Sequence, residues 1–200
     1  GKGTRALVLS PTRELVVQIE ENVKTYAKHI PVKVATVYGG VGENPQKKAL
    51  RSGVELIIAT PGRLMDLMGQ GCTNFSECEF FVLDEADRML DMGFLPNVRK
   101  IVSSLPKKRQ TLLFSATLSK EIEKLTREFQ HSPKFIEIGK RTNPADTVEQ
   151  FLYEVSKAQK IGLLKHLLGN NDLYSVLVFT RTKYGADRVA KQLGKSGIQI

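Results

Sequence analysis

Tryptophan is absent from the 200 residues, and cysteine and histidine are rare, with two and three copies. Cys72 and Cys78 are separated by five residues, which fits neither the C-x-x-C of zinc and redox sites nor a disulfide framework. His29, His131 and His166 are too scattered to predict a metal cluster. These scarcities argue against a disulfide-stabilised domain and against a transition-metal site. The two cysteines are expected to be ordinary reduced thiols.

Long apolar runs are also missing. None approaches the roughly 18 residues that a membrane span requires. The first ten residues, GKGTRALVLS, lack the regions of a secretory signal peptide. Because 41% of the residues are hydrophobic, a chain of this length can still bury a substantial core. We therefore expect a soluble, intracellular protein located in the cytoplasm.

Acidic side chains are outnumbered, since 30 Lys and Arg stand against 21 Asp and Glu, a net charge of +9. Residues 1–138 carry 20 basic and 16 acidic side chains (+4), and residues 139–200 carry 10 and 5 (+5). A basic chain favours a polyanionic partner such as nucleic acid, although many basic proteins bind none. The excess is densest in the C-terminal part.

Short apolar and β-branched runs alternate with amphipathic helical stretches along the chain. The predicted strands are residues 5–9, 32–38, 54–59, 80–84, 109–116, 134–138, 150–156 and 175–180. Several are continuously apolar, which is typical of strands buried on both faces of a parallel sheet. The pattern predicts an α/β fold with a doubly wound parallel sheet.

Residues 139–150, GKRTNPADTVEQ, interrupt this pattern and show no apolar period. We interpret them as a linker between a first domain, residues 1–138, and a second unit, residues 151–200. A single parallel strand pair with its crossover is too little to form a domain. The second unit is therefore expected to be truncated at its C-terminus.

Two predicted strands end in the same motif, SPTR and TPGR: a hydroxyl residue, proline, any residue, then arginine. Ser10 and Thr60 are expected to cap the following helices, with each proline at the first helical position. Arg13 and Arg63 then lie in the first turn, where the helix dipole disfavours a cation unless an anion binds there. A good helix start with a solvated arginine would explain one copy. Two copies at the carboxyl ends of strands favour an anion-binding site.

The segment FFVLDEADRML places Asp84, Glu85 and Asp87 directly after an apolar strand. Many nucleotide hydrolases hold magnesium with a carboxylate at a strand end, and the next acid can orient the attacking water. Asp84 would then hold Mg²⁺, through water, and Glu85 would polarise the nucleophile. The alternative is that acidic residues simply favour the first turn of the following helix.

Further motifs accompany this segment in a fixed order. They are PTREL at residues 11–15, Gln18, the pair Gly39 and Gly40, TPGRL at residues 60–64, DEAD at residues 84–87, SAT at residues 115–117 and VFTRT at residues 178–182. From about residue 5 onward this combination resembles the DEAD-box ATP-dependent RNA helicases, and the motifs and short linker look like those of bacterial-type members. The resemblance implies two RecA-like domains that bind ATP and RNA. Residues 1–138 would be most of the first domain, and residues 151–200 the start of the second.

The resemblance also implies roles for individual residues. Asp84 and Glu85 would serve Mg²⁺ and the hydrolytic water of ATP, and Asp87 would contact the SAT segment. Ser115 and Thr117 would link ATP turnover to local, sequence-independent unwinding of RNA duplexes or remodelling of RNA–protein complexes. The RNA backbone would be held by Pro11, Thr12, Arg13, Glu14, Gly39, Gly40, Thr60, Pro61, Gly62 and Arg63, and by Thr180 and Arg181 in the second domain. Such contacts hold RNA without reading its sequence, and contacts to the 2′-hydroxyl favour RNA over DNA.

The sequence contains no G-x-x-x-x-G-K-[ST] phosphate loop. The resemblance implies that this loop and the adenine-reading segment lie before residue 1, and that the arginine-finger motif lies beyond residue 200. The 200 residues alone are then expected to show little or no ATP turnover. Two other interpretations stay open: a non-catalytic RNA-binding clamp on the same fold, and a translocase that acts on DNA.

Overall fold

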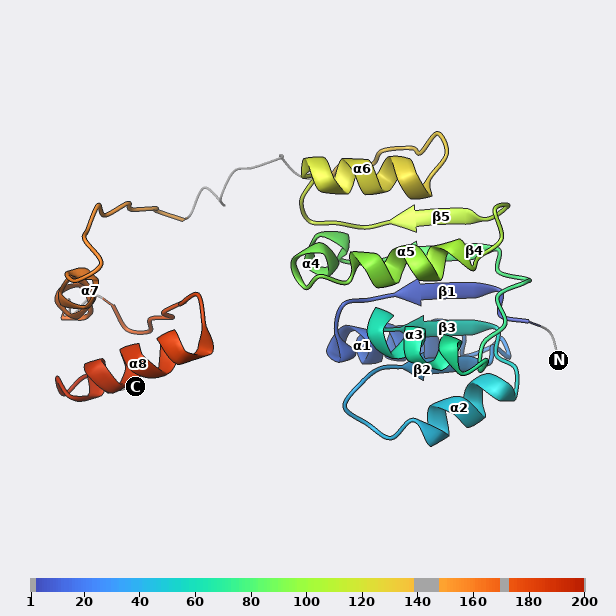
Figure 1. Cartoon of the computed structure of the whole chain (residues 1–200), viewed down its shortest axis with the longest axis horizontal. Helices are drawn as coiled ribbons and strands as arrows, with labels where there is room; N and C mark the ends of the chain where they lie inside the picture. The colour runs from blue at the N-terminus through green and yellow to red at the C-terminus, as the bar shows by residue number, and fades with distance from the viewer. Residues whose placement is uncertain (1–2, 139–147, 170–172, 200) are drawn as a thin grey trace. The chain divides into compact units, whose positions relative to one another are not determined.

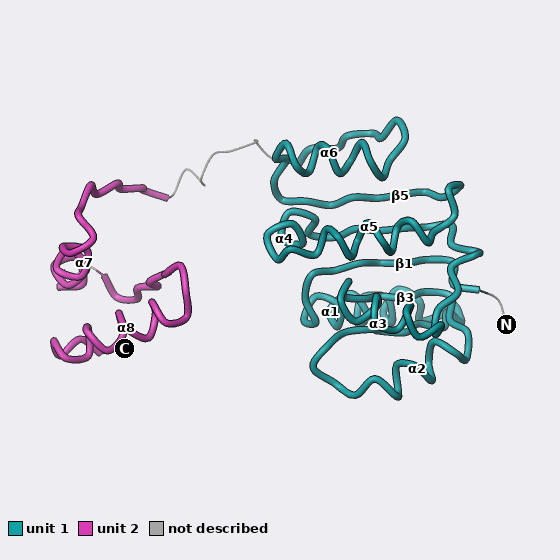
Figure 2. Tube along the Cα trace, viewed as in Figure 1, with its two compact units in different colours: residues 1–141 teal, residues 142–200 magenta. Residues whose placement is uncertain are grey.

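The computed structural model describes residues 3–138, 148–169 and 173–199. The chain divides into two compact units, Gly1–Arg141 and Thr142–Ile200 (Figure 2). Most of the predicted linker, residues 139–147, lies outside the described residues, and residues 148–150 form no helix or strand.

A parallel five-stranded sheet forms the centre of the first unit, in the order β2-β3-β1-β4-β5 (Figure 1). The strands are β1 (Ala6–Leu9), β2 (Val34–Val37), β3 (Leu56–Ala59), β4 (Phe80–Leu83) and β5 (Gln110–Leu113). On its two sides β1 pairs with β3 and β4, so that Leu7 lies opposite Ile57 and Phe81. The predicted α/β class with a parallel sheet is confirmed.

Helices cover both faces of this sheet. They are α1 (Arg13–Tyr26), α2 (Asn44–Arg51), α3 (Pro61–Gly69), α4 (Ala86–Asp91), α5 (Leu95–Ser103) and α6 (Lys120–Phe129). In the view of Figure 1, α3 and α5 lie in front of the strands and α1 lies behind them. Right-handed crossovers require this arrangement, because the chain moves one way from β1 to β2 through α1 and the opposite way from β3 to β4 through α3. The sheet is doubly wound, as predicted.

The core combines the apolar strand residues with one face of each helix. Fully buried side chains include Leu7, Leu9, Ile57, Phe81 and Leu83 from the strands, and Leu64, Leu67, Met89, Ile101, Ile122 and Leu125 from the helices. Burial of each such side chain contributes about 1.5–3 kcal/mol. Cys72 and Cys78 lie in the same core as free thiols, and burial raises the pKa of the Cys78 thiol.

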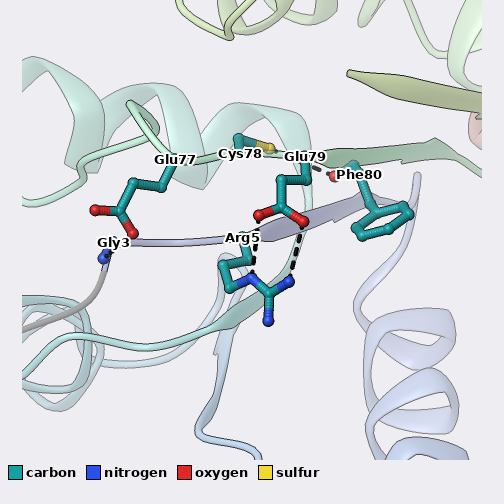
Figure 3. Close-up of polar contacts among 6 residues, drawn as sticks. All are labelled: Gly3, Arg5, Glu77, Cys78, Glu79 and Phe80. Atoms are coloured by element: carbon teal, nitrogen blue, oxygen red, sulfur yellow. Dashed lines mark hydrogen bonds and ion pairs between the residues drawn. The ribbon is translucent and has the colours of Figure 1, made fainter. Parts of the chain in front are cut away.

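Exposed polar side chains join the segments that precede β1 and β4, at the amino-terminal edge of the sheet (Figure 3). Arg5 forms an ion pair with Glu79, with 3.0 Å between Nη2 and Oε2, and the Gly3 N–H donates to Glu77 Oε2 at 3.0 Å. Both contacts link residues that are 74 positions apart in the sequence. They help to align the starts of two neighbouring strands, at the edge opposite the sequence motifs.

The second unit contains α7 (Lys160–Leu168) and α8 (Lys183–Gly194). Thr182 is the N-cap of α8, and its hydroxyl accepts a hydrogen bond from the Gly185 N–H at 3.0 Å. In the part of the chain that the structure describes, no helix has the length and apolar character needed to cross a membrane.

Three predicted strands are wrong. Residues 134–138 in the first unit, and residues 150–156 and 175–180 in the second, form no strand. Their apolar side chains are largely exposed, with Ile138 at 96% and Leu152 at 93%. A strand is stabilised by a hydrogen-bonded neighbour and by packing of its faces, and the described sheet pairs with none of these segments. Local composition predicted them, but composition alone cannot supply a neighbouring strand.

Candidate functional site

The candidate residues of the first unit lie where the strands end. Because all five strands are parallel, their carboxyl ends meet at one edge of the sheet. The glycine and arginine motifs follow β1, β2 and β3, and the acidic and hydroxyl motifs follow β4 and β5. The connection that leaves β1 runs behind the sheet, whereas those that leave its neighbours β3 and β4 run in front of it (Figure 1), and open α/β sheets bind ligands at such a switch point. The edge therefore has a basic half and an acidic half that meet beside β1.

Helix α1 begins at Arg13, two residues later than the sequence predicted. Thr12 is the N-cap, and its hydroxyl accepts an N–H from the first turn at 3.4 Å. Ser10 instead continues the strand ladder, since its N–H donates to the Ala59 carbonyl at 2.9 Å. Its side chain is fully buried, and its hydroxyl has no partner among the described residues. The predicted capping role of Ser10 is therefore wrong, and Pro11 precedes the helix instead of starting it.

Helix α3 begins as the sequence predicted. Thr60 is the N-cap with extended backbone, Pro61 is the first helical residue, and Arg63 lies in the first turn. The Thr60 side chain makes no capping hydrogen bond, so it does not compete for the N–H groups at the helix start. Because β3 pairs directly with β1, the first turns of α3 and α1 follow neighbouring strands.

The loop between β2 and α2 contacts both arginines. The Arg13 guanidinium lies over the Tyr38 ring, 5.2 Å from its centroid. Gly40 has a φ of 80°, which glycine adopts readily, and a Cβ added there would lie 4.0 Å from Arg13 Nη1. Arg63 Nη1 donates to the Val41 carbonyl at 3.2 Å. The structure thus assembles the three motifs of the basic half on one surface.

Members of this basic half differ in exposure. Pro11 and Pro61 are buried; Thr12, Thr60, Gly62 and Arg63 are partly exposed; and Arg13, Glu14, Gly39 and Gly40 are exposed. The prolines therefore belong to the framework, and the other residues form the surface. Two guanidinium groups beside two helix N-termini are suited to bind phosphate oxygens.

Asp84 and Glu85 follow β4 beside the end of β1. The Asp84 N–H donates to the Leu9 carbonyl at 2.9 Å, and Asp84 Oδ1 accepts the Glu85 N–H at 2.9 Å. Glu85 has left-handed backbone, with φ 48° and ψ 53°, which costs a residue other than glycine about 1–3 kcal/mol. Its Oε2 accepts a hydrogen bond from Arg88 Nη1 at 3.1 Å. The turn after β4 is therefore strained at Glu85 and is held in place by hydrogen bonds to Leu9, Asp84 and Arg88.

These two carboxylates do not form a complete metal cage. Among the described residues, no group of three or more His, Cys, Asp or Glu side chains could hold a metal. A pair of carboxylates nevertheless fits Mg²⁺, which proteins bind with one or two carboxylates together with waters and substrate phosphates. Burial raises the pKa of the Asp84 carboxyl; the Glu85 N–H opposes this shift, and the Glu85 carboxylate adds to it. A cation beside Asp84 would favour its charged form.

We expect Asp84→Asn to raise the melting temperature at pH 7 by roughly 1–3 °C, a small gain because Asp84 is partly exposed to water. A raised pKa means that the folded state keeps the proton to a higher pH than the unfolded chain. The contribution of Asp84 to stability therefore falls as pH rises from the ordinary Asp pKa of 3.8 to the raised value, and it changes no further above that value. The gain from asparagine should shrink toward pH 4 in thermal unfolding at a series of pH values. An equal or lower melting temperature for Asp84→Asn at pH 7 would contradict the expectation.

Asp87 joins the segment after β4 to the segment after β5. Its Oδ2 accepts hydrogen bonds from the Thr117 N–H at 2.9 Å and from Thr117 Oγ1 at 3.0 Å. Ser115 Oγ donates to the Thr117 carbonyl at 2.8 Å. Burial works against ionisation of Asp87, but the hydrogen bonds from Thr117, the Arg88 N–H and Ser115 outweigh it and lower the pKa of this carboxyl. The structure thus holds the acidic and SAT segments together through a charged carboxylate.

Thr180 and Arg181 belong to the second unit and directly precede α8. Both are exposed, and Thr180 Oγ1 donates to the Thr182 carbonyl at 2.8 Å. A Cβ added to Gly185 would lie 3.2 Å from Thr180 Oγ1, so glycine allows the hydroxyl to pack against the helix start.

Sequence reasoning missed three residues of the first unit. The Tyr38 ring forms a cation–π contact with the Arg13 guanidinium, and Arg88 forms an ion pair with Glu85. Gln46 forms hydrogen bonds with the backbone of the loop after β2. The spacing of Glu85 and Arg88 on a helix, i and i+3, could have predicted their ion pair. Nothing in the pattern distinguishes Gln46 from other glutamines, because its partners are backbone groups.

Comparison with known proteins identifies relatives along the whole chain. The chain is 44% identical over 199 residues to the DEAD-box ATP-dependent RNA helicase 20 of Arabidopsis thaliana, and the match covers 98% of this chain and 40% of that protein. It is 42% identical over 197 residues to the ATP-dependent RNA helicase RhlB of Pseudomonas aeruginosa, covering 97% of this chain and 50% of that protein. The chain therefore spans half or less of the length of these relatives.

A solved structure shares the fold. The crystal structure of a DEAD box protein from the hyperthermophile Methanococcus jannaschii matches with a TM-score of 0.65 and 35% identity, covering 98% of this chain and 53% of that chain. Residues 1–125 match the DEAD/DEAH box helicase family. This match covers more than half of the chain and takes in both the basic half of the edge and the acidic half with its SAT segment, so the chain belongs to the DEAD/DEAH box helicase family.

Proposed function

We propose that the protein that carries this chain is an ATP-dependent RNA helicase, which couples ATP hydrolysis to local, sequence-independent unwinding of RNA duplexes or remodelling of RNA–protein complexes. One observation carries the proposal: a single sheet edge holds a basic half after β1, β2 and β3 and an acidic half after β4 and β5. Within the acidic half, Asp87 links the segment after β4 to the SAT segment after β5. Relatives named as ATP-dependent RNA helicases support it, and we propose a cytoplasmic location with it.

RNA is proposed to bind at the basic half. Arg13, Arg63 and the N–H groups at the starts of α1 and α3 would contact phosphate oxygens. Gly39 and Gly40 would let the sugar-phosphate backbone approach the loop after β2 closely. These groups would contact only the sugar-phosphate backbone, so binding would not depend on sequence. Thr180 and Arg181 of the second unit are proposed to contact RNA as well.

ATP is proposed to react at the acidic half. Asp84 would hold Mg²⁺ through water, and the bound ion would neutralise negative charge on the phosphates of ATP. Glu85 would orient the attacking water toward the terminal phosphate through a hydrogen bond and accept its proton. The contact between Glu85 and Arg88 limits where this carboxylate can lie. Asp87, Ser115 and Thr117 would transmit the outcome of ATP turnover to the RNA-binding surface.

RNA-stimulated ATPase activity of the full-length protein tests this function. Single-stranded RNA should stimulate phosphate release more than DNA of the same sequence, and a short RNA duplex should be unwound in the presence of ATP. Equal stimulation by DNA would favour the DNA translocase, and RNA binding without hydrolysis would favour the non-catalytic clamp. Since the 200 residues contain no phosphate loop, we expect them to show little turnover by themselves.

The same assays applied to Ser115→Ala with Thr117→Ala test the coupling. This variant removes the Thr117 hydroxyl from Asp87 but leaves the N–H contact and both catalytic carboxylates in place. Unwinding should therefore fall more than ATP hydrolysis. Equal loss of both activities would show that these hydroxyls support turnover itself.

A further inference from the structure

Gln46 is a buried polar residue in the first turn of α2, with 7% of its surface exposed. Its carboxamide makes three hydrogen bonds, all to the backbone of the loop after β2. The Tyr38 N–H donates to Oε1 at 3.1 Å, and Nε2 donates to the Tyr38 carbonyl at 3.1 Å and to the Gly42 carbonyl at 3.2 Å. One side chain therefore holds both ends of a five-residue loop, residues 38–42.

Hydrogen-bond chemistry fixes the orientation of this carboxamide. A backbone N–H can only donate, so the group that faces the Tyr38 N–H must be Oε1. Nε2 then faces two carbonyls, which can only accept, and both of its hydrogens are used. An amide is the side chain that matches this set of partners. A carboxylate would place an oxygen against two carbonyl oxygens, and an apolar side chain would leave three backbone groups without these bonds.

The loop held by Gln46 carries the contacts of both arginines in the basic half. Arg13 lies over the Tyr38 ring, at one end of the loop, and Arg63 donates to the Val41 carbonyl, beside the other end. No carboxylate among the described residues forms an ion pair with either arginine. The loop is therefore a major determinant of where the two guanidinium groups lie.

We propose that Gln46 is a positioning residue for RNA binding, which fixes the loop so that Arg13 and Arg63 engage one phosphate backbone. The inference rests on the proposed RNA-binding role of the basic half. Gln46 is buried and acts through the loop, without touching RNA. Its effect should therefore depend on the presence of the two arginines.

Gln46→Met tests the proposal in the full-length protein, because methionine has a similar length but cannot form the three hydrogen bonds. We expect affinity for single-stranded RNA, measured by fluorescence anisotropy with ATP present, to fall about tenfold. The salt dependence of binding should become less steep, and ATP affinity should not change. Gln46→Glu keeps an acceptor for the Tyr38 N–H but opposes the two carbonyls, so it should bind RNA no better than Gln46→Met. Gln130→Met is the matched control, since it removes a hydrogen bond to the Thr111 carbonyl away from the loop and should leave RNA affinity unchanged.

A double-mutant comparison separates positioning from a general loss of stability. In a protein with Arg13→Met and Arg63→Met, adding Gln46→Met should cause no further loss of RNA affinity. A further tenfold loss would overturn the positioning role, as would normal RNA binding by Gln46→Met alone. If the arginine variant itself binds RNA normally, the proposed RNA surface is wrong, whatever Gln46 does. Gln46→Asn, which is one methylene shorter, replaces Gln46→Met in each comparison should the methionine variant not fold.

Discussion

Glu85→Gln in the full-length protein should lower RNA-stimulated ATP hydrolysis about a hundredfold or more, while ATP-promoted RNA binding stays within about twofold of the wild type. Glutamine matches glutamate in shape, but it cannot accept a proton from the attacking water. The Glu85 N–H bond to Asp84 does not involve the side chain, and the amide oxygen can still accept from Arg88. The variant should therefore keep the local fold and lose only ATP hydrolysis. Phosphate release and RNA anisotropy measure the two effects on one preparation.

Glu79→Gln is the matched control for this experiment. Glu79 precedes the same strand, β4, but lies at the amino-terminal edge of the sheet, where it pairs with Arg5. Its replacement should leave turnover unchanged. Normal turnover by Glu85→Gln would refute the role assigned to Glu85. A loss of RNA binding in the same variant would show instead that the substitution disturbs the whole edge.

Arg13→Met combined with Arg63→Met should weaken binding of single-stranded RNA about a hundredfold at physiological salt. Each guanidinium is proposed to neutralise one phosphate, so the slope of log affinity against log salt should become less steep by about 1.4, or about 0.7 for each arginine that is replaced. The loss of affinity should be similar for RNAs of different sequence, because interactions with the RNA backbone do not distinguish bases. Titrations at several salt concentrations measure both quantities.

Arg99→Met controls for the loss of positive charge. Arg99 pairs with Glu128 between α5 and α6 and takes no part in the basic half. RNA affinity should therefore change little. A similar loss for Arg99→Met would indicate that RNA is attracted by the overall charge of +9 and not by a defined surface. An unchanged salt slope for the double variant would place the phosphate-binding groups elsewhere.

The parts of the fold that follow from local pattern could be predicted. The five strands of the sheet coincide with predicted runs, and the central strands β3, β1 and β4 are the most apolar because helices cover both of their faces. The start of α3 could be predicted because Thr60 is suited to the N-cap position and Pro61 to the first helical position. Placement of the two arginines at one edge follows in turn from parallel strand order, since equivalent ends of parallel strands lie together.

Features that depend on distant partners could not be predicted. Residues 134–138 have strand composition, but a strand forms only where another strand pairs with it. Ser10 looks like a helix cap in sequence, yet the ladder to Ala59 extends β1 past it. Gln46 bonds to backbone groups, which every sequence offers, so no residue pattern marks it. The contact of Asp87 with Thr117 spans 30 positions, and it was anticipated only from the family resemblance.

The left-handed backbone at Glu85 has a consequence for directed evolution of this protein. Glycine adopts that conformation without strain, and asparagine adopts it more easily than glutamate, yet neither residue has a carboxylate. A library screened only for heat tolerance would therefore be drawn toward glycine or asparagine at this position. The selected variants would have a higher melting temperature but would lack the proposed catalytic acid. A screen for thermostable variants therefore has to measure ATP turnover as well as heat resistance.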